Sequence, residues 1–157
     1  MRHTLTLLLA LVVCFGFGGT VFGADLGTRD EANSLLKRAV AVLKADTNRG
    51  LEMFTSGEGG FIKKDLYVWC GGPDGMLTAH PHFMGVALKR WKDNSGKAVG
   101  AEIYAAARKE EFSEIAYKAP RPAGASKAVT ADDAQQVDKV SIFTKVGDNI
   151  CGVGYYK

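Results

Sequence analysis

The fold is decided by residues 65–85, DLYVWCGGPDGMLTAHPHFMG. Residues 66–70 are rich in aromatic and branched side chains, which predicts a strand. Residues 71–75 have the glycine and proline content of a turn, and residues 76–80 predict a returning strand. Pro81 ends that strand because proline has no N–H to donate to the ladder. The stretch therefore predicts an antiparallel hairpin.

The first strand of this hairpin separates two kinds of side chain. Successive side chains of a strand point to opposite faces, so Tyr67 and Trp69 share one face. Leu66, Val68 and Cys70 share the other. One face should pack against a helix and the other should line a pocket. Aromatic walls with polar tips suit a pocket, although Trp69 suits a plain core equally well.

Two helices are expected before the hairpin. Thr28 and Glu31 have the spacing of a capping box. Apolar residues then recur at helical intervals, which predicts a helix over residues 29–45. Asn48 can cap a shorter second helix that runs to Phe54.

After the hairpin, the pattern predicts one helix and three strands. The helix should cover residues 98–109, and the strands 113–118, 140–146 and 150–156. Residues 119–136 are rich in Ala, Pro, Ser and Asp and should form a long loop, in which 131–136 can make a helical turn. Helices followed mainly by strands predict an α+β domain with an antiparallel sheet.

Residues 1–23 are predicted to be a cleaved signal peptide. Arg2 provides a basic start, residues 5–13 are apolar apart from Thr6, and a glycine-rich stretch leads to cleavage after Gly23 or one residue later. The remaining residues, 24–157, suffice for one domain. We therefore expect a periplasmic or secreted protein. The alternatives are a retained N-terminal membrane anchor and a lipoprotein attached at Cys14.

Charge and cysteine content narrow the function classes. Removal of residues 1–23 lowers the formal net charge from +3 to +2, since Arg2 is the only charged residue removed, and this is not the profile of a nucleic-acid-binding protein. Cys70 and Cys151 remain. In an oxidising compartment they can form a disulfide, or they can be two small buried hydrophobic residues. No cysteine and histidine spacing indicates a zinc site.

Several short motifs stand in a particular order along the chain. They are DLYVW at 65–69 with DG at 74–75 and AHP at 79–81, DNSGK at 93–97 after a Trp-Lys pair, YKAP at 117–120, and DNICGVGYY at 148–156. In this order and spacing, residues 29–156 resemble the single Cache domain of type 2. This is the PAS-like extracytoplasmic sensor module of bacterial chemoreceptors and histidine kinases.

The resemblance implies a long N-terminal helix packed on a five-stranded antiparallel sheet, with a ligand pocket on the other face of the sheet. It implies small metabolites as ligands, often short carboxylates. In the PAS-like strand order the first and last strands are neighbours, which would place Cys70 beside Cys151. The resemblance thus favours a disulfide, although these positions are usually aliphatic in the family.

The chain also departs from the family. It ends at Lys157, one residue after the last predicted strand, where a sensor normally continues into a transmembrane helix and a signalling domain. The loop over residues 119–136 is longer than usual. Asn149 and Ala119 stand where the family often has Trp. The composition of the family's pocket therefore does not transfer residue by residue.

Eight residues are candidates for ligand binding because they offer aromatic surface, hydrogen bonds or positive charge near the expected pocket: Tyr67, Trp69, His80, His82, Trp91, Lys92, Tyr117 and Lys145. On an extended segment His80 and His82 should point the same way. Two histidines without a nearby carboxylate or thiolate are a weak metal signal, so we expect no metal.

Charged and aromatic candidates have ordinary explanations too. Trp91 and Lys92 can cap the ligand, with Lys92 facing a carboxylate, or they can be a core lid beside a surface lysine. Lys118 and Lys145 can supply the same positive charge, although lysines at strand ends are usually solvated. Tyr104 is a further source of a hydroxyl group.

No pattern of an enzyme is present in the sequence. The serines lack a Gly-x-Ser-x-Gly context, and residues 71–75 lack the Gly-Lys-Ser/Thr of a phosphate-binding loop. We therefore expect an exported sensor-type domain that binds a small organic ligand, preferably a short carboxylate, without catalysis or cofactor. A membrane-bound signalling partner would receive the signal. The alternative is a periplasmic accessory protein with a filled pocket, associated with a sensor or redox complex.

Overall fold

The computed structural model describes residues 25–120 and 136–157, so the predicted signal peptide lies outside the described residues. The helices in these ranges are α1 (Arg29–Ala45), α2 (Thr47–Ser56) and α3 (Val99–Ala106). The strands are β1 (Ile62–Lys63), β2 (Leu66–Gly71), β3 (Leu77–Ala79), β4 (Ser113–Pro120), β5 (Gln136–Val146) and β6 (Asn149–Tyr156). The predicted α+β class with an antiparallel sheet is confirmed.

The sheet follows the predicted PAS-like strand order. Its main path is β1-β2-β6-β5-β4, and β3 pairs with the end of β2 on the side away from β6. The first long strand, β2, thus lies beside the last strand, β6, as the resemblance implies. All five predicted strands are present. The two-residue strand β1 is a sixth that the sequence pattern did not indicate.

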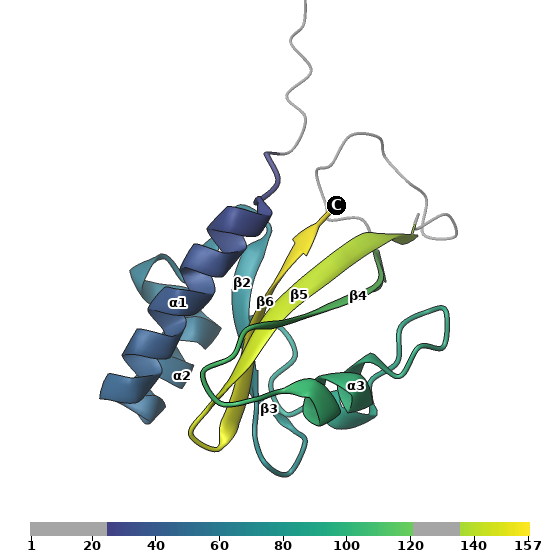
Figure 1. The fold of residues 1–157 in the computed structure, drawn as a ribbon. Coiled ribbons are helices and arrows are strands. Elements are labelled where there is room, and N and C mark those ends of the chain that lie inside the picture. The colour runs from purple at the N-terminus through teal and green to yellow at the C-terminus, as the bar shows by residue number, and fades with distance from the viewer. Residues whose placement is uncertain (1–24, 121–135) are drawn as a thin grey trace, which may run out of the picture.

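The helices lie on two different faces of the sheet. In Figure 1, α1 and α2 lie on one side of the strands and α3 lies on the other. Leu36 and Ala39 of α1 pack with Val68 and Val153 in one buried cluster. A second cluster beneath α3 contains Trp69. The predicted division of β2 into a helix-packed face and an opposite face is confirmed.

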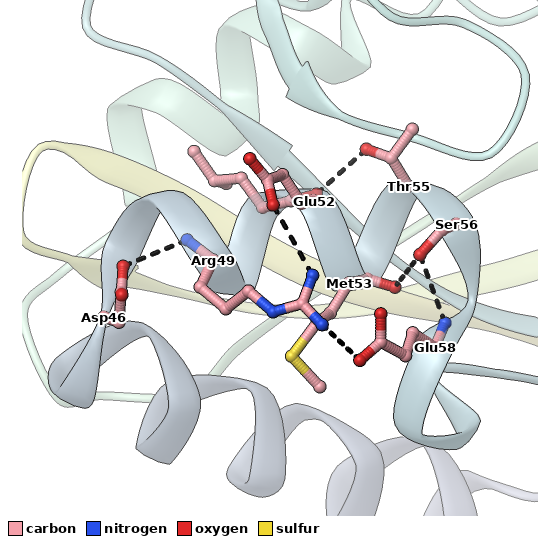
Figure 2. A network of polar contacts seen from close by, with 8 residues as sticks. Asp46, Arg49, Glu52, Met53, Thr55, Ser56 and Glu58 are labelled. Atoms are coloured by element: carbon pink, nitrogen blue, oxygen red, sulfur yellow. Dashed lines mark hydrogen bonds and ion pairs between the residues drawn. The ribbon is translucent and has the colours of Figure 1, made fainter.

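Both N-terminal helices are capped by side chains. At α1, Thr28 Oγ1 accepts from Glu31 N–H at 3.2 Å, while Thr28 N–H donates to Glu31 Oε2 at 2.8 Å, as the capping box predicts. The prediction of Asn48 as the cap of α2 is wrong. Asp46 is the cap, because its Oδ1 accepts from Arg49 N–H at 3.0 Å (Figure 2). Arg49 also pairs with Glu58 beyond the end of the helix.

Three predicted boundaries need correction. α3 ends at Ala106 rather than residue 109, because the backbone is extended at Ala107 and the carbonyl of Arg108 then accepts from Lys145 N–H at 3.0 Å. β4 and β5 pair continuously out to Pro120 and Gln136, so both are longer than predicted. The loop is correspondingly shorter. The suggested helical turn over 131–136 lies outside the described residues, except for Gln136, which begins β5.

A disulfide joins β2 to β6. Cys70 and Cys151 are direct partners in the register of these strands, and their sulfur atoms are bonded. Both residues are fully buried on the α1 face of the sheet. The crosslink therefore ties the two strands together on the face that does not carry the cavity described below.

No helix within residues 25–120 and 136–157 is long and apolar enough to cross a membrane.

Candidate functional site

A cavity of about 420 Å³ lies on the face of the sheet opposite α1. The strands β2, β4, β5 and β6 form its floor, and α3 with the segment after β3 forms its roof. The lining residues are Tyr67, Trp69, Leu77, His80, Phe83, Val86, Leu88, Trp91, Ile103, Tyr117, Ala119, Pro120, Lys139, Ser141 and Tyr156. This is the position in which the resemblance implies a ligand pocket.

Five of the eight predicted site residues line this cavity, namely Tyr67, Trp69, His80, Trp91 and Tyr117. They come from β2, from the segment between β3 and α3, and from β4, which are distant in sequence. The sheet therefore brings together most of the side chains that the sequence pattern selected. Their role in ligand binding stays a prediction.

The structure places the other three predicted residues outside the cavity lining. His82 and Lys92 are exposed. Lys145 is also exposed and lies at the far end of β5, beside a separate surface hollow that includes Lys44 and Phe112. Lys145 shares a face with Ser141, but it is too far along the strand to reach the same space.

His80 is held in one tautomer by a turn of the chain. Its Nδ1 accepts from the backbone N–H groups of His82 at 3.0 Å and Phe83 at 3.2 Å, which leaves Nε2 as the protonated nitrogen. The segment is therefore bent at residues 81–82 rather than extended, and the two imidazole rings lie 6.3 Å apart, with His80 buried and His82 exposed. Burial, with help from His82 and Lys139, lowers the pKa of His80 to about 4. His80 is thus a neutral hydrogen-bond donor at pH 7.

Lys139 is the cavity residue that the sequence pattern missed. Its side chain is buried, with 4% exposure for the residue, and Nζ lies 4.4 Å from the ring centre of Tyr156 and 5.1 Å from that of Tyr67. Burial lowers the pKa of Lys139 to about 8, against the attraction of Asp65. The amine therefore remains mostly protonated at pH 7.

The ammonium of Lys139 has no counter-ion in direct contact. Among the residues that the structure describes, Nζ forms neither an ion pair nor a hydrogen bond, and its contacts are the two tyrosine rings. Cation–π contacts compensate only part of the lost hydration of an ammonium. The cavity therefore contains a positive charge that an anion would stabilise.

Hydroxyl groups surround this charge. Tyr117 Oη lies 3.2 Å from Ser141 Oγ, and Tyr156 Oη donates to the carbonyl of Pro120 at 2.9 Å. Burial raises the pKa of Tyr117, and burial raises that of Tyr156 to about 12, so both are neutral phenols at pH 7. Within the described part of the lining, Lys139 is the only charged residue.

Two glycines of β6 make room for the side chains of the floor. A Cβ at Gly154 would lie 2.7 Å from Lys139 Cε, and a Cβ at Gly152 would lie 2.4 Å from Trp69 Cζ2. Both distances are shorter than real contacts allow. The absence of side chains on this face of β6 therefore lets Lys139 and Trp69 lie directly over the sheet.

The roof is fixed to the sheet by Asp93. Its carboxylate accepts from the backbone N–H groups of Lys97 at 3.0 Å and Lys118 at 2.9 Å, which lowers the pKa of Asp93 to about 2. Lys118 follows Tyr117 on β4, and the ring of Tyr117 meets that of Trp91 edge-on at 5.2 Å. The DNSGK motif thus holds Trp91 over the cavity.

The structural comparisons show the fold that this chain shares with known proteins. A methyl-accepting chemotaxis protein from Vibrio parahaemolyticus has 20% identity and a TM-score of 0.58, over 81% of this chain and 86% of that chain. The periplasmic sensor domain of a chemotaxis protein has 19% identity and a TM-score of 0.53, over 81% and 88%. A Cache chemosensory domain whose structure concerns carboxylic acid recognition has 18% identity and a TM-score of 0.51, over 81% and 86%.

The chain thus has the Cache fold that the sequence resemblance implied. No family model matches its sequence, and no curated protein matches it significantly. Within the described ranges, no group of three or more His, Cys, Asp or Glu side chains is arranged to hold a metal ion.

Proposed function

We propose that this protein is an exported sensor-type domain that binds a small organic carboxylate in the cavity without transforming it. The observation that carries the proposal is the buried ammonium of Lys139, which has no counter-ion in direct contact among the described residues, since Asp65 attracts it without forming an ion pair. A bound carboxylate would supply that counter-ion. His80 Nε2–H and the hydroxyl groups of Tyr117 and Ser141 would add hydrogen bonds around it.

The electrostatics of the site favour an anion over other small molecules. A cationic ligand would meet Lys139 with no carboxylate in the described lining to offset the repulsion. A neutral ligand could accept a hydrogen bond from the ammonium but would leave it without a counter-ion. Charge-assisted hydrogen bonds to a carboxylate are the stronger alternative.

The structural neighbours support both the ligand class and the location. One is a Cache domain that recognises carboxylic acids, and another is a periplasmic sensor domain. By analogy, the predicted signal peptide at residues 1–23 would direct this chain to the same side of the membrane. A membrane-bound signalling partner would then respond to the liganded form. The accessory-protein alternative expects a filled pocket, and a cavity of about 420 Å³ favours ligand binding instead.

Isothermal titration calorimetry of the purified chain with propionate and with propionamide tests this function. Propionamide has nearly the same shape without the negative charge, so propionate should bind at least tenfold more tightly. Lys139→Met should remove this preference. Lys145→Met is the matched control, because Lys145 is an exposed lysine at the far end of the same strand. Absence of binding by propionate and by larger carboxylates alike would refute the proposal.

A further inference from the structure

The size of the cavity exceeds what a short carboxylate fills. Its volume of about 420 Å³ corresponds to about 14 water molecules at about 30 Å³ each. Acetate or propionate would occupy a small part of this space and leave apolar walls in contact with water. The volume lies instead within the range of pockets that enclose ligands with a ring or a long chain.

The polar groups of the cavity gather at one end of the sheet. Lys139 is the register partner of Tyr117 on β4 and of Tyr156 on β6, so these three residues form one row across three strands. Ser141 lies two residues further along β5 and contacts Tyr117. A carboxylate at Lys139 would therefore sit near one end of the cavity.

The opposite end of the cavity is apolar. Trp69 pairs with Gly152 on β6, four residues from Tyr156, which places the two rows about 13 Å apart at about 3.3 Å per residue. Leu77, Leu88 and Ile103 belong with Trp69 to one buried apolar cluster and line the cavity. The indole of Trp69 lies over the bare backbone of Gly152 and provides an aromatic floor at this end.

The geometry points to a ligand that is polar at one end only. We propose that the cavity selects a monocarboxylate with an aromatic or similarly bulky apolar tail, whose carboxylate faces Lys139 and whose tail lies between Trp69 and Ile103. This inference rests on the proposed function and replaces the short carboxylate by a longer, amphipathic one. An α-ammonium group is excluded from the ligand, because Lys139 would repel it and the described lining has no carboxylate to pair with it.

A series of four ligands tests the inference by calorimetry on the purified chain. 3-Phenylpropionate should bind at least tenfold more tightly than propionate, because its ring fills the apolar end. Phenylalanine adds an ammonium group to the same skeleton, and 3-phenylpropanamide removes the negative charge. Each should bind at least tenfold more weakly than 3-phenylpropionate.

A variant that fills the apolar end provides a second test. Leu77→Trp should weaken 3-phenylpropionate at least fivefold and leave propionate within twofold. Leu77 pairs with Gly71, which pairs with Ile150 on β6, six residues from the Tyr156 that pairs with Lys139. Unchanged propionate binding would also show that the variant is folded. The ligand series needs no variant, so it decides the question even if Leu77→Trp does not fold.

The possible failures are distinguishable. Propionate binding as tightly as 3-phenylpropionate would overturn this inference and leave the proposed function standing. Phenylalanine binding as tightly as 3-phenylpropionate would overturn the exclusion of an ammonium group. If neither carboxylate binds, the proposed function itself fails and this inference fails with it.

Discussion

Replacing Lys139 by Met should stabilise the unliganded protein while it abolishes carboxylate binding. The pKa of Lys139 falls from 10.5 to about 8 because burial removes water from the ammonium. At about 1.4 kcal/mol per tenfold change in the ionisation constant, burial of this charge destabilises the fold by about 3 kcal/mol. Methionine keeps an unbranched apolar side chain of similar length and has no charge to bury.

Loss of the cation–π contacts reduces the expected gain. Nζ lies over the rings of Tyr67 and Tyr156, and each such contact contributes about 0.5 kcal/mol. The net expectation for Lys139→Met is therefore a gain of about 2 kcal/mol in the free energy of unfolding at pH 7. A gain of this size is uncommon for a single substitution.

The way in which the stability advantage of Lys139→Met changes with pH tests whether the buried charge of Lys139 is its cause. Below pH 8, Lys139 is protonated in both the folded and the unfolded protein, so the full destabilisation is present. Between pH 8 and 10.5 the unfolded chain binds the extra proton, and the stability of the wild type therefore rises with pH. The advantage of Lys139→Met should fall from about 2 kcal/mol at pH 7 to below about 1 kcal/mol at pH 10.

Urea unfolding of the wild type and the variant, each at pH 7 and pH 10 without ligand, measures these differences. Taking the difference between the two proteins at each pH cancels the titration of other lysines and tyrosines. Lys145→Met should change the stability by less than about 0.5 kcal/mol, as expected for an exposed side chain. A Lys139→Met protein that is no more stable than the wild type at pH 7, or an advantage independent of pH, would refute the reasoning.

Three further perturbations address the rest of the fold. Reduction of the Cys70–Cys151 disulfide, which closes a sequence separation of 81, should lower the free energy of unfolding by about 4 kcal/mol in urea titrations, and a change below about 1 kcal/mol would contradict the chain-entropy argument. Asp93→Asn should lower the melting temperature at pH 7, where the wild-type carboxylate is ionised. The difference should vanish as the pH falls from about 4 through about 2, because the stability that the lowered pKa confers is lost there, and a pH-independent difference would count against it. Gly152→Ala should cost about 1–3 kcal/mol in urea unfolding, because its Cβ would meet Trp69 at 2.4 Å and the backbone carbonyl oxygen of Ile142 at 2.8 Å. A neutral result would contradict this close packing of the indole and the strand backbone against Gly152.

Local patterns account for the parts of the fold that the sequence predicted. The capping box and the apolar spacing after Thr28 depend on neighbouring residues, so α1 begins and ends where expected. Alternation along residues 66–70 separates Tyr67 and Trp69 from Cys70 before any tertiary contact is known. The resemblance supplied the strand order, and with it the pairing of Cys70 with Cys151.

Local hydrogen bonds and one misplaced strand boundary account for the residues that the pattern misjudged. The cap of α2 is Asp46 rather than Asn48, because α2 begins at Thr47 and the carboxylate of Asp46 accepts from Arg49 N–H. His82 is exposed and lies outside the cavity lining, because the chain bends at residues 81–82, where two backbone N–H groups donate to the ring of His80. The predicted strand began one residue after Lys139, so alternation was not extended back to it. If the predicted strand had begun at Lys139, alternation would have placed Lys139 on the same face of β5 as Ser141, which lines the cavity.

The sequence by itself determined the helix positions, the two faces of β2 and the α+β class, because these follow from periodicity and caps over a few neighbouring residues. The tertiary structure alone decided which charge lies inside the cavity. Lysines near strand ends are usually solvated, and Lys139 is buried only because Tyr67 and Tyr156 come together over it from two other strands while Gly154 leaves room for its stem. Burial that depends on three strands converging cannot be read from the sequence around Lys139.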